Sequence, residues 1–323
     1  MRMRRGVLAW CLLGVAATAC GGSTPRTPTT PTHPTSSPNP PSGVTVIEVG
    51  GKPCASVEGG GAMWVSNYAD GTVSRIDPTT NAVTTTYETV GQPCGIVYAK
   101  GAVWVGGVGS ETLARMDPTT GKVTKEIDAG GQVYDVQVGF GSVWLVNREG
   151  GQVLRIDPRT TRVVARINAG PVLYGLAVTP AGVWASSQVE GTIIRIDPRT
   201  NRRIASIDGP DGATPFTFAW SPGALWVTTA DGVTARIDPK AERIVATVKA
   251  GGTRAPGDPD TVGGAVWIPE RVNGDLVRVD PGTNAITRTI RLGAGYSVAQ
   301  AGFGDVWVCN YQGSSIARVK VAA

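Results

Sequence analysis

The feature that most constrains this chain is a sevenfold internal repeat of about 40 residues that follows residue 43. A tryptophan recurs between small or apolar neighbours, with spacings of 40, 40, 40, 42, 41 and 40 residues. The seven tryptophans are Trp64, Trp104, Trp144, Trp184, Trp226, Trp267 and Trp307. Repeats of this length are typical of solenoids and propellers, in which each unit buries its apolar surface against its neighbours.

Each repeat also carries an arginine ten or eleven residues after its tryptophan, and in six repeats an apolar residue, aspartate and proline follow. These residues are Arg75, Arg115, Arg155, Arg195, Arg236, Arg278 and Arg318, with Asp77, Asp117, Asp157, Asp197, Asp238 and Asp280. Around them, short alternating apolar segments separated by turn residues predict four strands per repeat. The 44 glycines and only 17% charged residues also favour strands over helices. We therefore predict an all-β fold, a seven-bladed β-propeller of four-stranded antiparallel blades over residues 44–323.

The two ends of the repeat region complement each other. The last repeat has three strands and stops near residue 321, whereas the first is preceded by an extra segment, 47–52. That segment matches 127–132, which ends the fourth strand of the second repeat. We expect this N-terminal strand to complete the last blade, because closure removes an open sheet edge.

Three short motifs suggest a family. Val-Trp-Val-x-Asn occurs at 306–310, Gly-x-Val-x-Arg-Ile-Asp-Pro at 71–78 and Val-Gly-x-Pro at 90–93. Together they resemble YVTN-type propellers, and they are similar to the virginiamycin B lyase-like superfamily, whose repeats carry Trp-Phe-x-Glu and Gly-Arg-Ile. The resemblance implies the propeller fold across the whole repeat region. The lyases it points to would use a histidine and a carboxylate-held metal, and 44–323 contain no histidine.

The N-terminus is typical of an export signal. Residues 1–5 are basic, 6–19 form a short apolar run, and small residues precede Cys20. The run resembles a bacterial lipoprotein signal, which implies removal of 1–19 and lipidation of Cys20. Ala17 and Ala19 would also suit an ordinary signal peptidase, which would release a soluble protein. Both outcomes remain open at this point.

Residues 20–43 predict a disordered Thr/Pro-rich linker, since they lack apolar periodicity. The only histidine, His33, lies in it. The net charge of +5 includes four arginines in 1–43, so the repeat region keeps a single net positive charge. This balance gives no support to nucleic-acid binding.

We interpret the repeated residues as structural. The tryptophans should pack blade against blade, the arginines should stack on a tryptophan or pair with the nearby aspartate, and the Asp-Pro aspartates should form turns. No calcium loop, phosphate-binding loop or nucleophile elbow is present. We predict neither catalytic residues nor a metal or other cofactor.

Function should lie where the repeats differ, on one face of the propeller. Four positions stand out, ten and nine residues before each tryptophan and three and four residues after it. They predict a funnel of aromatic, amide and charged side chains around the axis. The candidate ligand-binding residues are Asn67, Tyr134, Asp135, Asn147, Arg148, Tyr174, Phe216, Asp258, Glu270 and Asn310, with Tyr68, Gln188, Arg271 and Tyr311 beside them.

Cys54 and Cys94 each follow a proline at the same position of adjacent repeats. Adjacent inner strands come close enough for a disulfide, and an exported protein meets an oxidising environment. The alternative is that both thiols stay free. Cys309 falls among small apolar residues and should be a buried free thiol.

These features favour an exported, lipid-anchored, non-catalytic propeller on the outer face of the bacterial cytoplasmic membrane. Its partner would be a protein, a peptide or a polar small molecule, and we expect a monomer. The alternative is a lyase- or lactonase-type enzyme that uses carboxylates or a metal in place of the missing histidine. It would use Asp135, Asp258, Asp260 and Glu270, and convergence of Asp258, Asp260 and Glu270 within about 5 Å would favour it.

Overall fold

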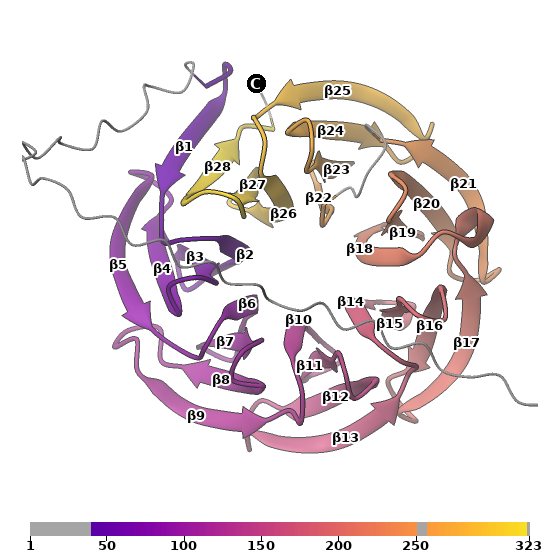
Figure 1. Cartoon of the computed structure of the whole chain (residues 1–323), viewed down its shortest axis with the longest axis horizontal. Helices are drawn as coiled ribbons and strands as arrows, with labels where there is room; N and C mark the ends of the chain where they lie inside the picture. Colours follow the sequence, from indigo (N-terminus) through magenta and orange to yellow (C-terminus); the bar gives the residue numbers. More distant parts are fainter. Residues whose placement is uncertain (1–39, 251–256, 322–323) are drawn as a thin grey trace, which may run out of the picture. The chain divides into compact units, whose positions relative to one another are not determined.

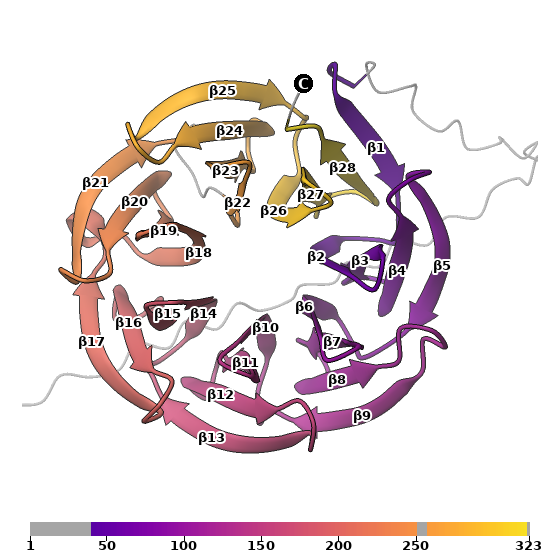
Figure 2. The ribbon, with the colours of Figure 1, turned by 180° about the vertical axis from the view of Figure 1, so that it is seen from behind.

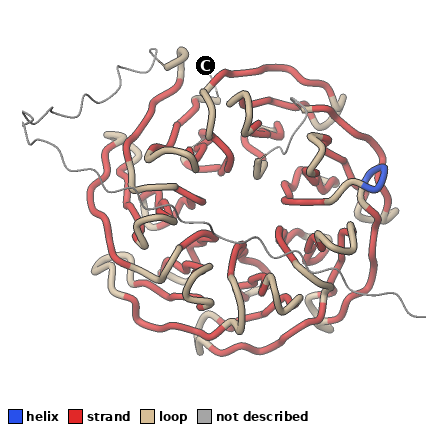
Figure 3. Tube along the Cα trace, in the orientation of Figure 1, coloured by secondary structure: helices blue, strands red, loops and turns tan. Residues whose placement is uncertain are grey.

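A computed structural model describes residues 40–250 and 257–321 of this chain. These residues form seven separate four-stranded antiparallel sheets, which stand as blades around a common axis (Figure 1). The prediction of an all-β, seven-bladed propeller is therefore confirmed. In the described ranges the strands are joined by turns and by one 3-10 helix, η1 (Pro210–Gly212) (Figure 3). None of the described residues belongs to a helix long and apolar enough to cross a membrane.

Six blades are built from strands that are consecutive in the chain, with the innermost strand first (Figures 1 and 2). Their bounds are β2 Pro53–Gly59, β3 Ala62–Asn67, β4 Thr72–Asp77 and β5 Ala82–Glu88; β6 Pro93–Ala99, β7 Ala102–Gly107, β8 Thr112–Met116 and β9 Val123–Asp128; β10 Val133–Gly139, β11 Ser142–Asn147, β12 Gln152–Asp157 and β13 Arg162–Asn168; β14 Leu173–Thr179, β15 Gly182–Ser187, β16 Thr192–Asp197 and β17 Arg202–Asp208; β18 Pro215–Ser221, β19 Ala224–Thr229, β20 Val233–Asp238 and β21 Arg243–Lys249; β22 Asp260–Val262, β23 Ala265–Glu270, β24 Asp275–Asp280 and β25 Ala285–Arg291.

The seventh blade combines both ends of the domain. It contains β26 (Tyr296–Gly302), β27 (Asp305–Asn310) and β28 (Ser315–Val319), and its outer strand is β1 (Val44–Glu48). β1 runs antiparallel to β28, in a register that places Val44 opposite Val319 and Glu48 opposite Ser315. Val44 and Ile47 of β1 are buried, so the strand contributes apolar contacts as well as hydrogen bonds.

The seven repeated tryptophans form the core between blades. Each is at most 1% exposed. Each indole N–H donates to an oxygen five residues earlier, across the turn from the innermost strand, as Trp144 does to the Gly139 carbonyl at 3.0 Å. A buried indole N–H needs such a partner. The tryptophans are therefore structural, as the sequence indicated.

The repeated arginines and aspartates are structural too. In every blade the arginine lies directly opposite the tryptophan on the next strand, as Arg155 lies opposite Trp144. In six blades the guanidinium stacks on that indole, with centroid distances of 4.9 to 6.0 Å. The Asp-Pro aspartates accept hydrogen bonds from backbone amides of their own turns, as Asp157 does from Arg159.

The sixth blade departs from this regular pattern. Its innermost strand, β22, has three residues, whereas the other six innermost strands each have seven. The residues before it pair with the seventh blade instead: Asp258 donates its amide to the Ser297 carbonyl and accepts from the Ala299 amide. This parallel bridge with the strand β26 holds the backbone of Asp258 at the central axis.

Candidate functional site

A cavity of about 410 Å³ opens at one end of the central axis. It is lined by residues of the innermost strands β2, β6, β10, β14, β18 and β26, together with the turns that follow several of the tryptophan-bearing strands. The volume falls in the range of small-molecule sites. The cavity is therefore our candidate functional site.

Local hydrogen bonding explains why the turn residues reach this cavity. In most blades the residue four places after the tryptophan donates its backbone amide to the carbonyl just before the innermost strand. In the third blade this bond runs from Arg148 to Gln132 at 3.0 Å. It folds the turn over the end of the blade, so that the side chain of Arg148 lies against the mouth of the cavity.

Five of the ten predicted binding residues line the cavity. They are Tyr134, Asp135, Arg148, Tyr174 and Asp258. Three of the residues named beside them, Tyr68, Arg271 and Tyr311, line it as well. The positions ten and nine residues before the tryptophan, and four residues after it, thus supply the aromatic and charged surface.

The other five predicted residues lie elsewhere, and the funnel prediction needs correction there. Asn67, Asn147, Glu270 and Asn310 all occur three residues after a tryptophan, and their side chains do not line the cavity. The side-chain oxygen of Asn147, Oδ1, accepts from the Gly150 amide, and its side-chain nitrogen, Nδ2, donates to the Ala129 carbonyl. The Glu270 carboxylate likewise accepts from two backbone amides, those of Val272 and Asn273.

Asn147 and Glu270 therefore cap their turns rather than present a side chain to a ligand, and Asn67 donates to Thr72 and Ser74 of its own blade. Phe216, the fifth residue, does not line the cavity. Its ring meets that of Tyr174 edge to face, with centroids 5.1 Å apart. Phe216 thus supports the cavity wall indirectly.

Polar residues deeper in the channel escaped the sequence reasoning. Ser56, Gln137, Thr217 and Gln300 line the cavity from the innermost strands. The sequence did contain a signal for them. A polar side chain on a mostly apolar innermost strand indicates a position that faces the axial cavity rather than the neighbouring blades.

Arginine and tyrosine side chains form one side of the cavity. The Arg148 guanidinium lies over the rings of both Tyr134 and Tyr174, at 5.0 and 5.3 Å from their centroids. The two tyrosine rings are 5.6 Å apart. Arg148 also donates from Nη2 to Gln188 Oε1 at 3.0 Å, which fixes its orientation across the gap between the third and fourth blades.

A second arginine reaches the same tyrosine. Arg271 hydrogen-bonds with the Tyr174 hydroxyl group, and its Nη2 lies 3.7 Å from Asp258 Oδ1. Burial raises the pKa of Asp258, and the charge of Arg271 opposes that rise. Both side chains remain about one-third exposed, so the pair faces the cavity rather than the protein interior.

Asp135 is the most perturbed carboxyl group of the cavity. Burial raises its pKa from 3.8 to about 7; the Leu176 amide opposes the rise, and the Asp258 charge adds to it. Asp135 Oδ2 accepts from the Leu176 amide at 2.8 Å, and Oδ1 accepts from Gln137 Nε2 at 3.1 Å. Near neutral pH this group therefore exists in both protonation states.

The three carboxylates whose convergence would favour the enzyme alternative have separate partners. Asp258 pairs with Arg271, and Glu270 caps its own turn. Asp260 accepts from the backbone amide of Ala301 at 2.7 Å. Of the three, Asp258 alone lines the cavity. Within 40–250 and 257–321, no three His, Cys, Asp or Glu side chains gather in a way that could hold a metal ion.

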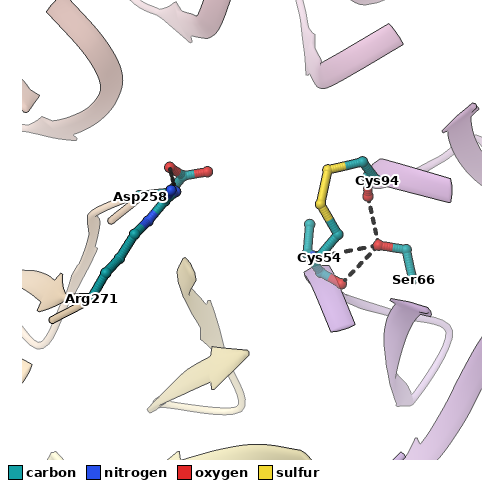
Figure 4. The surroundings of a disulfide bond; sticks show 6 residues. Cys54, Ser66, Cys94, Asp258 and Arg271 are labelled. Atoms are coloured by element: carbon teal, nitrogen blue, oxygen red, sulfur yellow. Dashed lines mark hydrogen bonds and ion pairs between the residues drawn. A yellow bond between two sulfur atoms is a disulfide. The ribbon is translucent and has the colours of Figure 1, made fainter. Parts of the chain in front are cut away.

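The wall opposite Asp258 and Arg271 contains a disulfide between Cys54 and Cys94, whose Cα atoms are 5.0 Å apart (Figure 4). Ser66 supports it by donating to the Cys94 carbonyl at 2.6 Å and by bonding both backbone groups of Ala55. Cys309 is a free, fully buried thiol whose pKa burial raises to about 12. Cys20, its signal segment and His33 lie outside the described residues.

Comparison with known proteins places the chain by its fold. No protein-family model matches it, and no curated protein matches its sequence. The resemblance to YVTN-type and virginiamycin B lyase-like repeats therefore stays a prediction. A solved structure, hydrazine synthase of Kuenenia stuttgartiensis, superposes with a TM-score of 0.72 at 14% sequence identity. The match covers 84% of this chain and 96% of that one. At such low identity the similarity shows the seven-bladed propeller fold alone.

Proposed function

We propose that this protein is a non-catalytic binding propeller that holds a polar small molecule, a peptide or a protein partner at the axial cavity. The observation that carries the proposal is the position of the cavity residues. The cavity is lined at positions where the seven repeats differ, by Tyr134, Asp135, Arg148, Tyr174 and Asp258. The residues that all repeats share pack within and between the blades instead. Binding sites are typically built in this way, from variable loops on a rigid scaffold.

The chemistry of the cavity supports binding over the lyase or lactonase alternative. Convergence of Asp258, Asp260 and Glu270 would favour that alternative, and each is instead bound to a different partner. Paired tyrosine rings, two guanidinium groups and amide side chains instead match the usual inventory of recognition sites.

Capture by the full chain tests this proposal. Tagged protein is incubated with envelope extract and, separately, with a panel of polar small molecules. The double variant Tyr134→Ala/Tyr174→Ala should lose at least about tenfold in affinity, since interface tyrosines carry roughly 1–3 kcal/mol each. The matched control is Tyr87→Ala/Tyr98→Ala, which removes two tyrosines that do not line the cavity. Equal capture by both double variants, with unfolding transitions showing that both fold, would contradict the proposal.

We also propose that Cys20 carries a lipid anchor and holds the propeller outside the bacterial cytoplasmic membrane. The support comes from the sequence of 1–20. A Cys20→Ala variant should move from the membrane fraction to the soluble extracytoplasmic fraction. Wild-type protein that is itself wholly soluble after export would instead assign cleavage to the Ala17-x-Ala19 site.

A further inference from the structure

The four charged side chains around the cavity differ in their partners. Four charged side chains line it: Asp135, Arg148, Asp258 and Arg271. Asp258 and Arg271 form a pair. Asp135 accepts two hydrogen bonds from neutral groups, Gln137 and the Leu176 amide. Arg148 is left without an anionic partner among the described residues, since its contacts are Gln188 and two tyrosine rings.

An uncompensated, partly buried guanidinium is costly unless something balances its charge. Arg148 is held in place by the rings of Tyr134 and Tyr174 and by Gln188, so it cannot simply turn out into solvent. Its Nη1 is buried and has no hydrogen-bond partner. The orientation of Arg148 is thus fixed before any ligand arrives, whereas its charge is not yet neutralised.

Arg271 places a second guanidinium at the same point. Arg148 lies over the ring of Tyr174, and Arg271 bonds to the hydroxyl group of that residue. The Nε of Arg271 is also buried without a partner. Two guanidinium groups thus lie on one tyrosine, and only that of Arg271 is paired with an aspartate.

From this geometry we propose that the cavity recognises a small organic carboxylate, whose anionic group pairs with Arg148 and whose flat body lies against the tyrosine rings. The inference rests on the proposed binding function and names its ligand class. A carboxylate would give Arg148 the anionic partner that it lacks, and guanidinium groups bind carboxylates through paired hydrogen bonds. A phosphate dianion would add a second negative charge beside Asp258 and Asp135, so it fits less well.

The rings available to the ligand body lie on two sides of the axis. Tyr134 and Tyr174 come from the third and fourth blades, and Tyr68 and Tyr311 from the first and seventh. Tyr68 and Tyr311 contact each other, with ring centroids 5.8 Å apart. Tyrosine faces stack on aromatic rings and on the apolar faces of sugars alike. An aromatic acid and a sugar acid therefore share the chemistry that this cavity selects.

Calorimetric titration of the full chain with matched probe pairs tests the proposal and separates these two sources. The pairs are 4-hydroxybenzoate with 4-hydroxybenzamide, and D-glucuronate with D-glucose; inorganic phosphate is titrated alone. At least one acid should bind about tenfold or more tightly than its neutral partner, because a charge-assisted hydrogen bond is lost in the neutral compound.

Two variants of Arg148 assign the preference to this residue. Arg148→Met should weaken binding of that acid at least about tenfold and leave the neutral partner unchanged, since the methionine keeps the apolar stem only. Arg148→Lys keeps the charge and should recover part of the affinity. The matched control is Arg166→Met, because Arg166 lies on β13, the outermost strand of the same blade, and donates to the backbone carbonyls of Asp128 and Ala129 at the end of β9.

Several outcomes would overturn the inference. These are equal binding of acid and neutral partner, tighter binding of phosphate than of either acid, or no effect of Arg148→Met. Absence of binding by every probe would also overturn it. The proposed function is judged separately, by capture from envelope extract with the Tyr134 and Tyr174 variants, so the two failures remain distinguishable.

Discussion

Two arginines of the third blade show how the propeller divides structure from recognition. Arg155 occurs at a position that all seven repeats share, and Arg148 at one where they differ. Arg155 stacks on Trp144 at 4.9 Å. Its guanidinium donates to Ser142 and to the carbonyl of Phe140 in its own blade, and to Pro198 and Asn201 in the next.

Arg148 also lies against aromatic rings, yet it makes one side-chain hydrogen bond, to Gln188. The two side chains differ in how many of their hydrogen-bond donors have a protein partner. The repeated arginine has protein partners on several sides and joins two blades, whereas the variable arginine keeps an unpartnered nitrogen beside a cavity. In this blade the arginine that builds the ring is bonded within it, and the arginine at the cavity retains capacity for a ligand.

The largest expected effect concerns two cavity-lining residues that stabilise the fold. The disulfide Cys54–Cys94 joins two adjacent blades with a sequence separation of 40. Closing such a loop stabilises the fold by about 4 kcal/mol on the chain-entropy model. Cys54→Ala/Cys94→Ala should therefore lower the free energy of unfolding by about that amount.

Denaturant unfolding with and without reductant measures this effect, and the non-reduced, alkylated protein should yield a Cys54–Cys94 linked peptide in mass spectrometry. Cys309→Ala is the control, because that thiol is free and its loss should not alter the response to reductant. Identical unfolding energies in both conditions would show that the bridge does not form.

A smaller effect compares two aspartates by pH. The pKa of Asp135 is raised to about 7, so the folded state binds its proton more tightly than the unfolded chain does. The associated stability is complete below about pH 4 and is lost as the pH rises to 7. Asp135→Asn should then stabilise the protein at pH 8, by roughly 2 kcal/mol, and change little at pH 4.

Asp77, at a repeated position, should behave in the opposite way. Hydrogen bonds from the Thr79 side chain and backbone lower its pKa, so its contribution is present above the unfolded value of 3.8 and is lost as the pH falls. Asp77→Asn should destabilise at pH 8. Melting temperatures of both variants across this range provide the comparison. The same sign of change at pH 8 would contradict the distinction between mouth and scaffold.

The scaffold was predictable from sequence because it repeats. Seven copies of one pattern reveal the strand order and the buried tryptophans, and six of them reveal the turn aspartates. The same core contact recurs around the ring: Arg155 stacks on Trp144, and the equivalent arginine stacks on the tryptophan in five other blades.

The site was predicted less completely, because orientation at a strand end depends on side-chain hydrogen bonds. Asn147 and Arg148 are neighbours, yet Asn147 turns back to cap Gly150 and Arg148 faces the cavity. The glycine in the following turn was a usable signal for an asparagine cap. Glu270 was harder to place, since a glutamate fills the capping position in one repeat only.

The most direct test of the account measures two properties of the same two variants, Arg148→Met and Arg155→Met. Unfolding energy reports on the scaffold, and capture of the partner or carboxylate probe by the folded protein reports on the mouth. We expect Arg155→Met to lower the unfolding energy by roughly 2–4 kcal/mol and to bind normally while folded. Arg148→Met should retain its unfolding energy within about 1 kcal/mol and lose at least about tenfold in affinity. Reduced binding by Arg155→Met together with unchanged binding by Arg148→Met would contradict the assignment of structure to repeated positions and recognition to variable ones.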